Sequence, residues 1–102
     1  MTTVQVKRLQ DGLIVGLIVN GHSGYAKSGS DIVCSSISTA LNMTISIIEK
    51  LGIKYEYKIQ TKMPEIIFSL KEPNQYSQIV LNSFIENIEA LVKEYKEYVK
   101  VI

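Results

Sequence analysis

The chain has 102 residues, 46% of them hydrophobic, which suffices for a single domain with one core but not for two. Eleven basic and ten acidic residues give a net charge of +1, so we expect no surface for direct nucleic-acid binding and none for an anionic membrane. One cysteine and one histidine exclude an internal disulfide framework and the usual zinc ligand sets, and we expect no metal or cofactor. The longest apolar run, 13–19, is too short to span a bilayer. We treat residues 1–102 as one soluble, cytoplasmic domain.

Two strands joined by a tight turn open the chain. Residues 3–9 alternate weakly between polar and apolar side chains, and Asp11-Gly12 is typical of a two-residue hairpin turn. The run 13–20 is rich in β-branched residues, as a buried strand is. Together these patterns predict an N-terminal β-hairpin.

A helix and a second hairpin follow. From Ile32 onward apolar residues recur with helical spacing, and Gly52 follows them as the expected C-terminal cap. Residues 53–59 alternate strictly between apolar and charged side chains, which predicts a strand with one solvent-exposed face. Pro64 then introduces the apolar segment 65–70, and a proline suits the start of a strand or an edge strand.

A second helix closes the predicted order. Asn74 precedes a stripe of apolar residues with helical spacing, and we interpret the charged segment 93–100 as a solvated face of this helix. The order ββαββα predicts an α/β (α+β) two-layer sandwich, in which both helices cover one face of a small mixed or antiparallel sheet. Because 13–19 is apolar on both faces, we expect the second sheet face to be buried in a homodimer.

The single histidine and the single cysteine flank a loop that is punctuated by glycines. His22 directly follows the strand expected at 13–20, and Cys34 lies about one turn into the helix expected from Ile32. Both side chains therefore lie at the same end of the sandwich. The glycines Gly21, Gly24 and Gly29 permit backbone conformations with positive φ and a loop that is able to close over a peptide. A thiol near a base is what a cysteine protease needs.

The start of the helix offers two further elements of that chemistry. If Asp31 or Ser30 caps the helix, Cys34 falls in the first turn, where unpaired N–H groups and the helix dipole favour the thiolate. The same N–H groups are suited to receive the oxyanion that forms from a scissile carbonyl. We therefore expect one helix end to serve both purposes.

Each of these residues also has a purely structural interpretation. A cysteine early in an apolar helix, like Cys34, is commonly a small buried core residue. His22 suits a turn hydrogen bond, and Asp31 suits a helix cap. Ser38, one turn beyond Cys34, either orients the site or bonds back to the helix backbone. Tyr25 either lines a substrate cleft or packs the loop.

A longer string of residues resembles the signature of a known family. Gly-His-Ser-Gly-Tyr-Ala at 21–26, Gly29, Asp-Ile-Val-Cys at 31–34 and Ser38 are similar to the motif of the ribosomal-processing cysteine protease family Prp. The specific part covers positions 20–41, and the element order is compatible over the whole chain. In that family the motif histidine is the catalytic base and the motif cysteine the nucleophile, which map to His22 and Cys34. Asp31 and Ser38 map to supporting residues.

The resemblance implies a specific function. Proteases of this family remove a short N-terminal extension from large-subunit ribosomal protein twenty-seven, cutting after an apolar, Phe-containing sequence, and they form homodimers. The resemblance therefore implies a cytoplasmic cysteine endopeptidase of ribosome maturation, with a ribosomal protein precursor as its peptide substrate. Two departures stand out: Ser23 and the pair Ser35-Ser36 replace alanines that are common at these places in the family. All are small, so we expect them to affect fine specificity and not the chemistry.

Two hypotheses from other classes accompany this one. In the first, the chain is a non-catalytic, ribosome-associated binding module in which Cys34 is structural; the near-neutral charge argues mildly against direct RNA contact. In the second, Cys34 is a redox sensor. A sensor needs a resolving thiol of its own or an external one, and this sequence has no second cysteine to supply its own. A thiol whose alkylation is fast and depends on His22 would favour the protease, and an inert thiol would favour the binding module.

Overall fold

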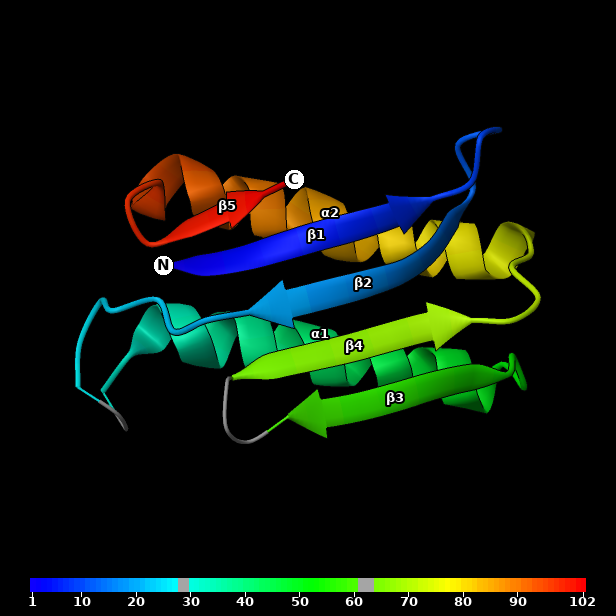
Figure 1. The fold of residues 1–102 in the computed structure, drawn as a ribbon, viewed down its shortest axis with the longest axis horizontal. Coiled ribbons are helices and arrows are strands. Elements are labelled where there is room, and N and C mark those ends of the chain that lie inside the picture. The colour runs from blue at the N-terminus through cyan, green and yellow to red at the C-terminus, as the bar shows by residue number, and fades with distance from the viewer. Residues whose placement is uncertain (28–29, 61–63) are drawn as a thin grey trace.

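The fold is a five-stranded sheet with two helices on one face (Figure 1). A computed structural model describes residues 1–27, 30–60 and 64–102 of the protein. The elements in chain order are β1 (Thr2–Arg8), β2 (Ile14–Asn20), α1 (Ile32–Lys50), β3 (Tyr55–Gln60), β4 (Glu65–Leu70), α2 (Gln75–Tyr95) and β5 (Val99–Val101). The strands lie in the order β3-β4-β2-β1-β5. The predicted fold class, a two-layer α/β sandwich with both helices on one face, is confirmed.

The core lies between the sheet and the helices, because every second side chain of a strand points toward the helices. Leu17 of β2 pairs with Phe68 of β4, and Val4 lies two residues from the β1 partner of Leu17. All three side chains are almost fully buried. The helices bury their apolar stripes against this face, through Val33, Ile37, Leu41 and Ile48 from α1 and Leu81, Phe84, Ile85 and Ile88 from α2. Each fully buried side chain of this size contributes about 1.5–3 kcal/mol. Helix α1 is long and apolar enough to cross a membrane, yet its buried stripe is that of a core helix.

The first hairpin differs from prediction in its turn. The Leu9 N–H donates to the Leu13 carbonyl at 2.8 Å, and the Gly12 N–H donates to the Leu9 carbonyl at 2.9 Å. The closing pair therefore encloses three residues, with Gly12 at φ +92°, where the sequence predicted a two-residue turn. A glycine with positive φ at the last position is typical of a three-residue hairpin loop. A separate β-bulge lies outside the turn: Lys7 pairs with Gly16 and Arg8 with Ile14, so β2 carries one extra residue, Val15. The hairpin itself is confirmed.

The chain ends in a fifth strand that the sequence analysis did not predict. A turn closed by the Tyr98 N–H on the Tyr95 carbonyl, at 2.8 Å, ends α2 and reverses the chain. Strand β5 then pairs parallel to β1, with Val99 beside Thr2, and makes the sheet mixed. Val99 is fully buried. The interpretation of 93–100 as a solvated helix face is therefore wrong beyond Tyr95, because three residues are too few to show a strand period.

The outer sheet face is more polar than the sequence suggested. Over the regularly paired part of β2, the residues on this face are Gly16, Ile18 and Asn20, and Ile18 is the large apolar one among them. Ile18 pairs with Ile67 of β4, and both are half-buried. Asn20 donates to the Glu65 carboxylate at 2.8 Å. The apolar surface on this face is therefore a strip of two residues, Ile18 and Ile67. The expectation that 13–19 is apolar on both faces holds on the outer face only at Ile18.

Candidate active site

The loop between β2 and α1 lies at the end of the sheet where β2 stops and β4 starts (Figure 1). Gly21 begins the loop at φ +88°, and its N–H donates to the Pro64 carbonyl at 2.8 Å. A Cβ at this position would lie 2.5 Å from the Met1 carbonyl oxygen. Only glycine fits this turn without strain, and the turn sets where the exposed His22 side chain begins.

Asp31 caps helix α1, as one of its two interpretations predicted. Its Oδ1 accepts hydrogen bonds from the N–H groups of Val33 and Cys34, both at 3.0 Å. Cys34 is half-buried in the first turn, where the sequence placed it. The cap also changes one expectation: two of the N–H groups expected to be open to a substrate oxyanion are already engaged by the Asp31 carboxylate.

Ser23 links Asp31 to Cys34 and was not predicted as a site residue. It is 2% exposed, its N–H donates to Cys34 Sγ at 3.3 Å, and its hydroxyl oxygen lies 3.4 Å from that sulfur. The same hydroxyl donates to Asp31 Oδ2. Its hydrogen bond, followed by that of the Cys34 N–H, lowers the pKa of Asp31 to about 2. The available signal was a small polar residue next to the candidate base, which the sequence analysis connected only with specificity.

His22 shares the site with Cys34 without bonding to it in this state. Within the described ranges, no hydrogen bond joins His22 to Cys34 or to Asp31, whose side-chain oxygens accept from Ser23, Val33 and Cys34. His22 is exposed. Catalytic hydrogen bonds are often long before substrate binds, so an open His22 is compatible with the role of a base.

A groove of about 950 Å³ brings most of the predicted site residues together. His22, Cys34, Asp31 and Ser38 all line it, as do Gly21 and Gly24. The groove also has an apolar lining drawn from the sheet and from α1, formed by Val19, Ile32, Ile37, Ile59 and Ile66. A thiol beside an apolar groove is suited to a peptide with apolar side chains.

Among the predicted loop residues, Tyr25 packs away from this groove. Tyr25 packs edge-on against Tyr95 of α2 and against Tyr98, with ring centroids 5.4 and 5.3 Å apart. It is not among the described residues that line the groove. Of its two interpretations, the structure therefore favours packing of the loop. Gly29 lies outside the described residues.

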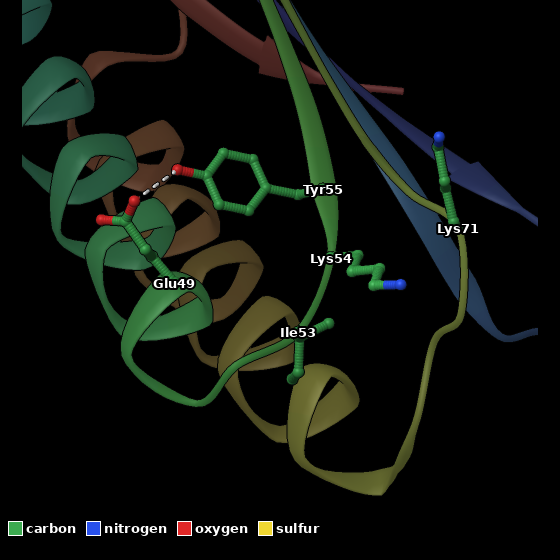
Figure 2. Close-up of a pocket in the computed structure, with 5 residues that line it drawn as sticks. All are labelled: Glu49, Ile53, Lys54, Tyr55 and Lys71. Carbon is green, nitrogen blue, oxygen red and sulfur yellow. Dashed lines mark hydrogen bonds between the residues drawn. The ribbon is translucent and has the colours of Figure 1, made fainter.

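A second cavity, of about 440 Å³, lies at the opposite end of α1 (Figure 2). Its described lining is Glu49, Ile53, Lys54, Tyr55 and Lys71, none of which is a thiol or an imidazole. The Tyr55 hydroxyl donates to Glu49 at 3.4 Å, and burial, together with the Glu49 charge, raises the Tyr55 pKa. Among its described lining residues this cavity has no thiol or imidazole, whereas Cys34 and His22 both line the groove.

Comparison with known proteins identifies the family. The family model described as cysteine protease Prp matches residues 1–100. The chain belongs to the Prp family. It is a cysteine protease, as the family resemblance implied. The ribosomal processing cysteine proteases Prp of two Staphylococcus aureus strains, Mu50 and NCTC 8325, are each 24% identical over 111 residues, covering 99% of this chain and 97% of theirs.

Solved structures agree with this Prp-family assignment in their fold. A Prp crystal structure from S. aureus with a covalently linked product peptide superposes with a TM-score of 0.91 at 22% identity, covering 99% of this chain and 97% of that one. A second, with a substrate peptide, gives a TM-score of 0.88 at 20% identity and covers 100% and 98%. The fold of this chain is therefore that of Prp proteases over its whole length.

Proposed function

We propose that this protein is the endopeptidase that removes the N-terminal extension of large-subunit ribosomal protein twenty-seven, in the cytoplasm. The observation that carries the proposal is the groove, in which His22, Cys34 and an apolar lining occur together. The curated relatives are named ribosomal processing proteases, which supports a ribosomal precursor as the peptide substrate. An apolar, Phe-containing recognition sequence matches the isoleucine and valine side chains along the groove.

The proposed chemistry uses Cys34 as nucleophile and His22 as base. His22 takes the thiol proton, and the sulfur electron pair attacks the scissile carbonyl carbon. The imidazolium then gives its proton to the departing amine as the C–N bond breaks, which leaves an acyl group on Sγ. A water molecule, deprotonated by His22, hydrolyses this thioester and restores the thiol. Asp31 and Ser38 act as supporting residues, Asp31 by fixing the first turn of α1 through its cap.

Peptide cleavage tests the substrate. A synthetic peptide that spans an apolar Phe-Phe-Ala junction is incubated with the protein, and mass spectrometry locates the cut. We expect cleavage at one bond, and loss of cleavage when both phenylalanines are replaced by aspartate, because the groove lining is apolar. The full ribosomal precursor is the second substrate. If the folded protein cuts neither the peptide nor the precursor, the proposed substrate is wrong.

We also propose that the protein is a homodimer, as the family resemblance implied. The Ile18 and Ile67 strip on the outer sheet face is the apolar surface that supports association through the sheet. Light scattering coupled to size exclusion is expected to give twice the mass of one chain, and Ile18→Lys is expected to reduce it to one chain. A wild-type mass of one chain at micromolar concentration would contradict the dimer.

A further inference from the structure

The hydroxyl of Ser23 occupies a position between the nucleophile and a carboxylate. It contacts Cys34 Sγ at 3.4 Å on one side and Asp31 Oδ2 on the other, and it also accepts from the Tyr25 N–H at 3.3 Å. At 2% exposure it has little access to water. Its hydrogen bonds are therefore set by these protein groups alone.

The available protons decide the direction of each hydrogen bond. Asp31 is ionised at neutral pH, because its pKa is about 2, and an ionised carboxylate only accepts. The single hydroxyl proton of Ser23 is therefore committed to Asp31. With that proton engaged, Ser23 Oγ faces the sulfur as an acceptor. The contact is favourable only when Cys34 carries its own proton and donates S–H to Oγ.

We propose that Ser23 is a positioning residue that holds Cys34 as a neutral thiol in the resting protease, through the chain Cys34 S–H to Ser23 O–H to Asp31 carboxylate. Activation then breaks the S–H bond and forms an N–H bond on the His22 imidazole, while the electron pair stays on sulfur. No oxidant or reductant is involved. The inference rests on Cys34 as the nucleophile and not on the identity of the substrate.

A second contact of Ser23, made by its backbone, allows the effect of its side chain to be tested separately. The Ser23 backbone N–H donates to Cys34 Sγ at 3.3 Å, and a backbone donor favours the thiolate. Ser23→Ala keeps this donor and removes the oxygen that accepts from the thiol. The substitution therefore shifts the balance toward the thiolate.

The test is the pH profile of Cys34 alkylation by iodoacetamide, followed by the mass of the intact protein. We expect Ser23→Ala to move the midpoint of the profile about half to one pH unit lower, which makes alkylation about three- to tenfold faster below the wild-type midpoint. Ser36→Ala is the matched control, since the exposed Ser36 bonds to the Ile32 carbonyl on the same helix, and it should leave the midpoint in place. A midpoint that is unchanged or higher in Ser23→Ala overturns the proposal.

A measurement on the wild-type protein keeps the proposal testable even if Ser23→Ala does not fold. The infrared difference spectrum between wild type and Cys34→Ala isolates the S–H stretch of Cys34. We expect this band at neutral pH, at a frequency typical of a hydrogen-bonded thiol. Its absence at neutral pH would show a resting thiolate and overturn the proposal. Neither measurement uses a peptide, so failure of the proposed substrate in cleavage assays leaves both results interpretable.

Discussion

Single side chains explain how Cys34 is placed. Asp31 caps α1 with one carboxylate oxygen and accepts the Ser23 hydroxyl with the other, so the loop and the helix start are joined at the position of Cys34. The motif in the sequence was enough to name His22, Cys34 and Asp31. It did not reveal the role of Ser23, because that role depends on the loop folding back onto the helix, and such a contact leaves no periodic pattern.

The Asp31 carboxylate is expected to make stability depend on pH in the acidic range. Its pKa falls from 3.8 to about 2 in the fold, so its contribution is fully present above about pH 4 and is lost as pH falls toward 2. Asp31→Asn keeps a residue that can cap the helix but removes the charge. The difference in unfolding free energy between wild type and Asp31→Asn, measured by urea unfolding, should therefore shrink between pH 4 and pH 2. A difference that stays constant over that range would contradict this assignment.

Gly21 is expected to tolerate no side chain. Gly21→Ala combines a strained positive φ with a Cβ placed 2.5 Å from the Met1 carbonyl oxygen, so it should lower stability by about 1–3 kcal/mol. Gly12→Ala is the control, because Gly12 has a similar φ of +92° and nothing within 4 Å of the added Cβ. Thermal unfolding of both variants checks this. An equal loss in the two variants would mean that backbone strain alone, and not the close approach of Met1, makes glycine necessary at 21.

The secondary-structure elements differ in how readily the sequence predicts them. Helices α1 and α2 show long 3.6-residue periods and recognisable caps, Asp31 and Asn74, so their starts were predicted correctly. Strand β3 shows a period of two. Strand β5 has only three residues, and it exists because β1 offers a free edge to pair with after α2 ends. Pairing of this kind depends on the tertiary structure, which local sequence does not report.

Strand β5 is expected to contribute to stability despite its length. Val99 is fully buried between the sheet and α2, so Val99→Ala removes two buried methyl groups and should cost about 2 kcal/mol. Lys100→Ala, on the exposed side of the same strand, should cost less than about 0.5 kcal/mol. Chemical denaturation of the two variants measures both values. If Val99→Ala unfolds at the same denaturant concentration as wild type, β5 is not an integral part of the fold.

The molecule as a whole brings the candidate site residues together at one end of the sandwich. The sheet ends, the loop from Gly21 and the first turn of α1 meet there and form the groove, while the opposite end holds the smaller cavity, whose described lining has no thiol or imidazole. The architecture followed from strand and helix periods in the sequence, and so did the common location of His22 and Cys34. The shape of the groove did not, because residues from β2, β3 and β4 reach it only after the sheet has assembled.

The central claim is that Cys34 and His22 together perform peptide cleavage in this groove. The most direct measurement compares the cleavage rate of the Phe-Phe-Ala peptide by wild type, Cys34→Ala, His22→Ala and the control Ser36→Ala, with all four shown to be folded by circular dichroism. We predict that Ser36→Ala retains the wild-type rate and that both site variants lose at least about a hundredfold. Cleavage by folded Cys34→Ala or His22→Ala at the wild-type rate would contradict the assignment of these residues.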